Sequence, residues 1–140
     1  MLCFLQIVIA DTHHTLTVED YMQTIEEALY KLKKSKFRSS FYLTKAERTY
    51  IEEKGMDAVR RHAADFVAQK LAPAEPYNDG KQTPMHGHPA FKAMHATGCC
   101  CRGCLEKWYK IPKGRPLNER QQGKIVNLLM AWIETELKGK

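Results

Sequence analysis

The apolar residues near the C-terminus recur every three or four positions, which is the period of an α-helix buried along one face. Asn118 and Gln121 stand just before them at the spacing of a capping pair. The apolar residues are Ile125, Leu128, Leu129, Trp132, Ile133 and Leu137. A helix with one apolar stripe must be covered by other elements, so the sequence predicts a long helix packed against the rest of the chain.

The same period predicts further helices upstream, over residues 17–32, 44–55 and 57–71, and two short ones after Pro89 and Arg102. Apart from the first ten residues, no stretch alternates between apolar and polar residues as a strand does. We therefore expect a mainly α protein, a compact single-domain helical bundle with a Cys/His-rich central loop and short helices. A chain of 140 residues is typical of one domain.

The first ten residues, MLCFLQIVIA, are apolar apart from Gln6. They are too few to span a bilayer as a helix, and they lack the basic start and cleavage site of a signal peptide. They predict a buried strand, or a tail docked on the core or on a second copy of the chain. We divide the chain into an apolar N-terminal segment, 1–16, and a helical domain, 17–140. The predicted partners are a second subunit bound through that segment, and no membrane.

Residues 86–109 hold four of the five cysteines and three of the six histidines. Cys101 and Cys104 form a C-x-x-C pair, which can bind a metal ion or close as a redox disulfide. An odd number of cysteines without an export signal indicates the reducing cytoplasm, where clustered thiols hold metal more often than they form structural disulfides. The sequence predicts a cytoplasmic protein with its chemistry in this block.

Zinc is the predicted ion, and its tetrahedral site needs two ligands beyond Cys101 and Cys104. His95 lies six residues before Cys101, across a glycine turn, and His62 lies on the apolar face of the predicted helix 57–71. These four residues are the predicted metal ligands. Rival ligands are His86, His88, Cys99 and Cys100. The alternatives are a hydrogen-bonded core histidine at position 62 and cysteines that act as small buried hydrophobes.

A thiol-dependent enzyme is the alternative function. Cys101 or Cys104 would be a thiolate at a helix N-terminus beside Arg102, with His95 or His88 as its acid–base partner. The strand that precedes a thioredoxin-like motif is missing. The pattern for haem attachment fails as well, because a leucine follows Cys104 where histidine is required.

Nucleic acid is a further predicted partner. The formal net charge is +6, and residues 102–124 contain seven basic side chains against two acidic ones. Trp108 and Tyr109 lie among them and could stack on bases, while a second basic run covers residues 31–38. The alternatives are a solvated basic surface and a tryptophan that anchors the core.

Several blocks resemble an uncharacterised bacterial family of small proteins, one of the families named as domains of unknown function. They include RRHAADF (60–66), NDGKQTPMHGHPAF (78–91) and HATGCCCRGCLEKWY (95–109). The resemblance spans roughly residues 35–133 and implies counterparts of His62, Gly87, His88, Pro89, His95, Cys100, Cys101 and Cys104. The chain departs from the family pattern at His86, Cys99 and Tyr109, which disfavours the first two as ligands. The resemblance implies no activity.

Overall fold

The computed structural model describes residues 24–139, and in this range it contains six α-helices and no strand. The elements are α2 (Ile25–Lys33), the 3-10 turn η2 (Arg38–Ser40), α3 (Lys45–Lys54), α4 (Met56–Phe66), the π-helical turn η3 (Val67–Leu71), α5 (Pro89–Ala96), α6 (Arg102–Tyr109) and α7 (Glu119–Gly139). The predicted mainly α fold is confirmed. The apolar segment 1–16, with the dimer contact predicted for it, lies outside the described residues, and the predicted division into segment and domain stays a prediction.

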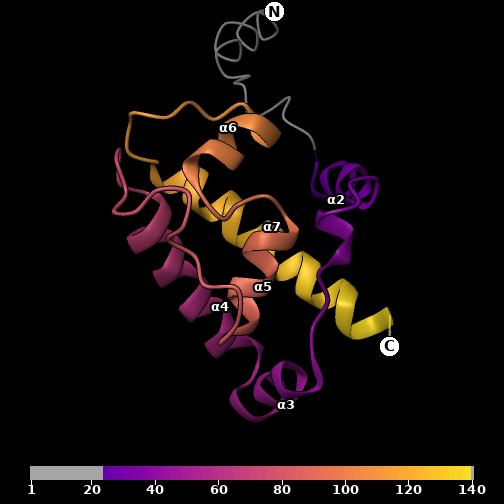
Figure 1. The fold of residues 1–140 in the computed structure, drawn as a ribbon. Helices are drawn as coiled ribbons and strands as arrows, with labels where there is room; N and C mark the ends of the chain where they lie inside the picture. The colour runs from indigo at the N-terminus through magenta and orange to yellow at the C-terminus, as the bar shows by residue number, and fades with distance from the viewer. Residues whose placement is uncertain (1–23, 140) are drawn as a thin grey trace, which may run out of the picture.

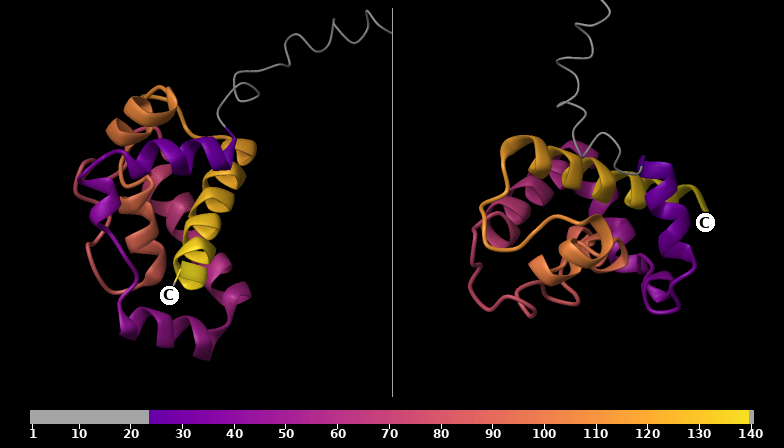
Figure 2. Two further views of the ribbon diagram at one scale, coloured as in Figure 1. Left: turned by 90° about the vertical axis from the view of Figure 1, so that its right-hand side faces the viewer. Right: turned by 90° about the horizontal axis from the view of Figure 1, so that it is seen from above.

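Helix α7 is the longest helix of residues 24–139 and packs against α2, α4, η3 and α5 (Figure 1). It packs most extensively against α5 and α4, which lie along it. The left view of Figure 2 shows α2 across one end of the domain and α3 at the other, with α7 running between them. Near its C-terminal end, Glu136 accepts the N–H of Leu43 through Oε1 and the guanidinium of Arg48 through its carbonyl.

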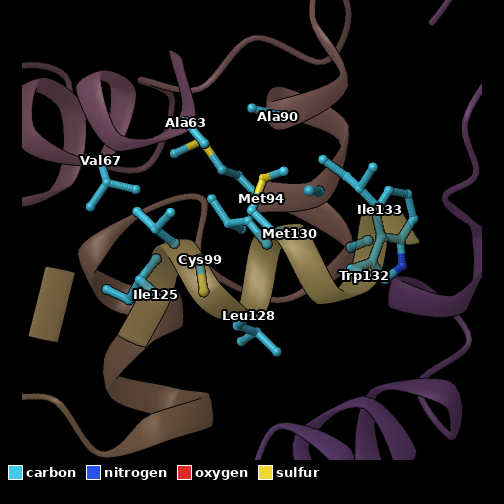
Figure 3. Close-up of a cluster of buried hydrophobic side chains, with 14 of the residues drawn as sticks. Ala63, Val67, Ala90, Met94, Cys99, Ile125, Leu128, Met130, Trp132 and Ile133 are labelled. Carbon is cyan, nitrogen blue, oxygen red and sulfur yellow. The ribbon is translucent and has the colours of Figure 1, made fainter. Parts of the chain in front are cut away.

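The core lies where α4, α5 and α7 meet (Figure 3). Ala63, Val67, Met94 and Ile133 belong to this core, all with no exposed surface. The stripe predicted for the last helix is confirmed, because Ile125, Leu128, Leu129, Trp132 and Ile133 are each at most 9% exposed. Cys99 belongs to the same cluster, and its complete burial raises the pKa of its thiol to about 12. It behaves as a small hydrophobe, one of the alternatives open from the sequence.

Gly98 makes the turn that leads from α5 into the cysteine block. Its φ of +74° is a conformation that side chains disfavour, and a Cβ there would lie 2.7 Å from Cδ1 of Trp108. We expect Gly98→Ala to lower the free energy of unfolding by about 2–4 kcal/mol, since backbone strain and overpacking add. Urea unfolding measures this.

Gly123→Ala is the matched control, because Gly123 lies within α7 and a Cβ there would meet nothing within 4 Å. The free energy of unfolding of this variant should rise by about 0.5–1 kcal/mol, because alanine has a higher helix propensity than glycine. Equal effects of the two substitutions would contradict the role of the Gly98 turn.

Candidate metal centre

Three cysteines meet at the N-terminus of α6. The Sγ atoms of Cys100, Cys101 and Cys104 all lie within 4.8 Å of one another, the only such group of metal-ligating side chains in residues 24–139. Cys101 caps the helix, since its Sγ accepts the N–H of Cys104 at 3.4 Å. The sulfurs of the C-x-x-C pair, Cys101 and Cys104, therefore converge, and Cys100 joins them from the preceding turn.

Arg38 reaches these sulfurs from η2, which lies far away in the sequence. Its Nη1 donates to the carbonyl of His95 at 2.7 Å and lies 3.6 Å from Sγ of Cys100, while its Nη2 lies 3.1 Å from Sγ of Cys104. The residue is only 9% exposed. Burial disfavours its charge, but the two cysteines outweigh this and raise the pKa of Arg38 above its usual value. The site thus contains a fixed cation.

The thiols differ in acidity. The pKa of the Cys100 thiol is lowered to about 7, mainly by a hydrogen bond with Cys104, whose Sγ lies 3.6 Å away. Burial raises this pKa, and the contact with Arg38 lowers it further. The same hydrogen bond, together with burial, raises the pKa of Cys104, and burial raises that of Cys101. The acidic thiol is therefore Cys100. A catalytic role of Cys101 or Cys104 stays a prediction.

Arg102 fixes the position of the start of α6 through hydrogen bonds of its side chain. It is 1% exposed, and its guanidinium donates to the carbonyls of Leu71 at 3.2 Å and Pro73 at 2.8 Å on one side. On the other side it donates to the carbonyls of Pro112 at 3.0 Å and Arg115 at 2.9 Å. This arginine therefore ties two separate segments, the end of η3 with the residues after it and the loop between α6 and α7, to the start of the helix that carries the sulfurs.

His95 is near the centre but is not one of the convergent groups. Its Nε2 lies 3.1 Å and 3.2 Å from the carbonyl oxygens of Thr83 and Pro84, and its ring stacks on Phe41. Because a carbonyl can only accept, Nε2 carries the proton and the lone pair of the neutral ring is on Nδ1. The ligand role of His95 stays a prediction.

His62 lies in a separate group of imidazole and aromatic rings between α3, α4 and α5. Its Nδ1 lies 3.0 Å from Nε2 of His88 and 3.3 Å from the hydroxyl of Tyr50. Phe66 and Phe91 pack against His88. The structure thus gives His62 a hydrogen-bonded place in the bundle, and its predicted role as a metal ligand stays a prediction.

Two residues of the predicted basic surface are inside the protein. Arg38 and Arg102 belong to the basic runs at 31–38 and 102–124, yet both are buried and bind sulfur atoms or carbonyls. Nucleic acid as a partner stays a prediction that rests on the remaining lysines and arginines. In the described part of the chain, no helix combines the length and hydropathy needed to cross a bilayer.

Comparison with known proteins places the chain by sequence. No solved structure matches it. A family described as "Domain of unknown function (DUF4186)" matches residues 26–134, a range that contains Arg38, the three convergent cysteines and Arg102. The match covers all the helices of the described residues except the first residue of α2 and the last five residues of α7. The chain therefore belongs to the DUF4186 family of uncharacterised domains.

Proposed function

We propose that the protein binds one zinc ion through the thiolates of Cys100, Cys101 and Cys104. The observation that carries this proposal is the convergence of their Sγ atoms within 4.8 Å. A tetrahedral ion with Zn–S bonds of about 2.3 Å holds its sulfur ligands about 3.8 Å apart, and the sulfurs of Cys100 and Cys104 are already 3.6 Å apart. Little movement is needed for binding.

The charges at the site also fit a zinc–thiolate centre. Three thiolates around a dication leave one net negative charge, and a buried charge is costly unless it is paired. Arg38, with hydrogen bonds to the sulfurs of Cys100 and Cys104, supplies the compensating positive charge. Thiolate is a soft ligand that binds zinc rather than magnesium or calcium, which prefer oxygen.

The fourth coordination position is open to a histidine or to a water molecule. His95 is the histidine that we propose for it, because a ligating imidazole usually donates its other N–H to a carbonyl. Nε2 of His95 makes contacts of this kind with Thr83 and Pro84, which leaves Nδ1 to coordinate. In His62, by contrast, Nδ1 is engaged by His88 and Tyr50.

Elemental analysis of protein purified without added metal tests the zinc proposal. We expect about one zinc per chain in the wild type, and a loss of affinity of about 100-fold or more when Cys100, Cys101 or Cys104 is replaced by serine. Cys99→Ala is the matched control, since Cys99 adjoins the site but is buried in the core. Wild-type protein that neither carries zinc nor takes it up from a competing chelator would refute the proposal.

Two histidine variants address the fourth position in the same measurement. His95→Gln should weaken zinc binding by about 10–100-fold if His95 is a ligand. An unchanged affinity would assign the position to water. Loss of zinc in His62→Gln would confirm the ligand role predicted for His62, whereas retention would leave His62 to its contacts with His88 and Tyr50.

A further inference from the structure

We propose that a hydroperoxide oxidises the cysteine centre to a disulfide between Cys100 and Cys104, and that this oxidation releases the metal ion. The inference rests on the proposed zinc site and adds a chemical signal that empties it. It follows from the positions of the sulfur atoms and of Arg38.

Cys100 and Cys104 are the two sulfurs placed to react with each other. Their Sγ atoms are 3.6 Å apart, so they must approach by about 1.5 Å to reach the disulfide bond length. Cys101 is held differently, because its Sγ accepts the N–H of Cys104 as the cap of α6. The reacting pair is therefore C-x-x-x-C rather than the C-x-x-C pair that the sequence draws attention to.

Arg38 holds these two sulfurs as a pair. One guanidinium nitrogen donates to Cys100 and the other to Cys104, so a single planar group sets their separation and offsets the repulsion between two thiolates. Oxidation removes the negative charge of both sulfurs. Arg38 then keeps its hydrogen bond to the His95 carbonyl but loses its two anionic partners. Because a buried charge without a partner is costly, this loss favours opening of the contact between η2 and α6.

The reaction balances with one hydroperoxide as the oxidant. Both sulfurs are thiolates when they hold the metal ion. Cys104 is the more exposed of the two residues, so its sulfur attacks a peroxide oxygen, the O–O bond breaks, and the departing oxygen takes a proton from water. The Cys100 thiolate then attacks the resulting sulfenic acid at sulfur, the S–S bond forms, and the S–O bond breaks with loss of hydroxide. The two sulfurs give up two electrons. Cys101, even together with His95, holds zinc too weakly to retain it.

The test uses zinc-loaded full-length protein that carries Cys3→Ser and is treated with hydrogen peroxide beside a chromophoric zinc chelator. We expect one zinc released per peroxide consumed, a protein mass lower by two hydrogen atoms, and renewed zinc binding after reduction with a dithiol. Trypsin cleaves after Arg102 and separates Cys104 from the other cysteines, so the disulfide appears as two peptides joined through Cys104.

Variants in metal-free protein identify the partner of Cys104. Cys101→Ser and Cys99→Ala should form the disulfide within about threefold of the parent rate, and Cys100→Ser should be slower by about tenfold or more. A disulfide that persists in Cys100→Ser and disappears in Cys101→Ser would overturn the assignment.

The two proposals fail in different ways. Protein that binds no zinc before peroxide is added refutes the zinc site. Protein that binds zinc and keeps it under peroxide, or loses it while its cysteines gain oxygen and form no Cys100–Cys104 disulfide, refutes the redox release alone.

Discussion

Replacing Arg102 with methionine is expected to lower the free energy of unfolding by about 3–5 kcal/mol. Methionine has a similar length but no donors, so it leaves the carbonyls of Leu71, Pro73, Pro112 and Arg115 without the guanidinium that now binds them. Burial disfavours the charge of Arg102 and lowers its pKa, and the nearby Asp79 opposes this. Urea unfolding monitored by tryptophan fluorescence measures the change.

Arg61→Met is the matched control, because Arg61 is exposed on α4. Its replacement should change the free energy of unfolding by no more than about 0.5 kcal/mol. Zinc affinity provides a second readout, since Arg102 stands between Cys101 and Cys104 at the start of α6. If Arg102→Met unfolds like Arg61→Met, the four carbonyl contacts do not carry the stability assigned to them. If it destabilises the fold without weakening zinc, α6 keeps its position by other contacts.

Lowering the pH from 7 to 5 is expected to remove about 2 kcal/mol of stability through His88 alone. Burial, and then the nearby His62, lower the pKa of His88 from 6.5 to about 4, with Glu47 opposing. Between these two values the unfolded chain binds a proton that the folded protein does not, so stability falls as the pH falls. A hydrogen bond also disfavours the protonated ring in the folded protein. Nδ1 of His88 accepts the N–H of Ala90 at 2.9 Å, and a proton on Nδ1 would abolish that helix cap.

The variant His88→Asn tests this, because asparagine keeps a capping acceptor at the start of α5 but does not titrate. It should lose stability at pH 7 through poorer packing against Phe66 and Phe91, and it should lack the 2 kcal/mol decline that the wild type shows between pH 7 and about 5. Equal slopes for the two proteins, measured by urea unfolding at each pH, would assign the decline to other groups. The groups facing His88 are His62, Tyr50 and Glu47.

Local sequence was enough to predict most of the helices. The first was predicted over residues 17–32, but α2 begins only at Ile25, because Thr24 is extended and caps the helix with its side chain. The 3-and-4 spacing of Ile125 through Ile133 appears as the buried face of α7, with Leu137 partly buried beyond it, and Thr44 with Glu47 forms the capping box that begins α3. Both features depend on residues within one or two turns of each other, which is why they can be predicted without knowledge of the fold. The cysteine block also marks the place of the site, since its three convergent sulfurs lie within five consecutive residues.

The partners of these residues could be decided only by the tertiary structure. Arg38 reaches Cys100 and Cys104 across 62 and 66 positions of the chain, and in the sequence it is one cation in a basic run. Arg102 was an obvious neighbour for the thiols, yet its side chain turns away to four backbone carbonyls. Hydrogen bonds between distant residues leave no periodic or capping pattern. For this reason the sequence located the cysteine centre, whereas only the packing of η2 against α5 and α6 brings the guanidinium of Arg38 to the sulfurs of Cys100 and Cys104.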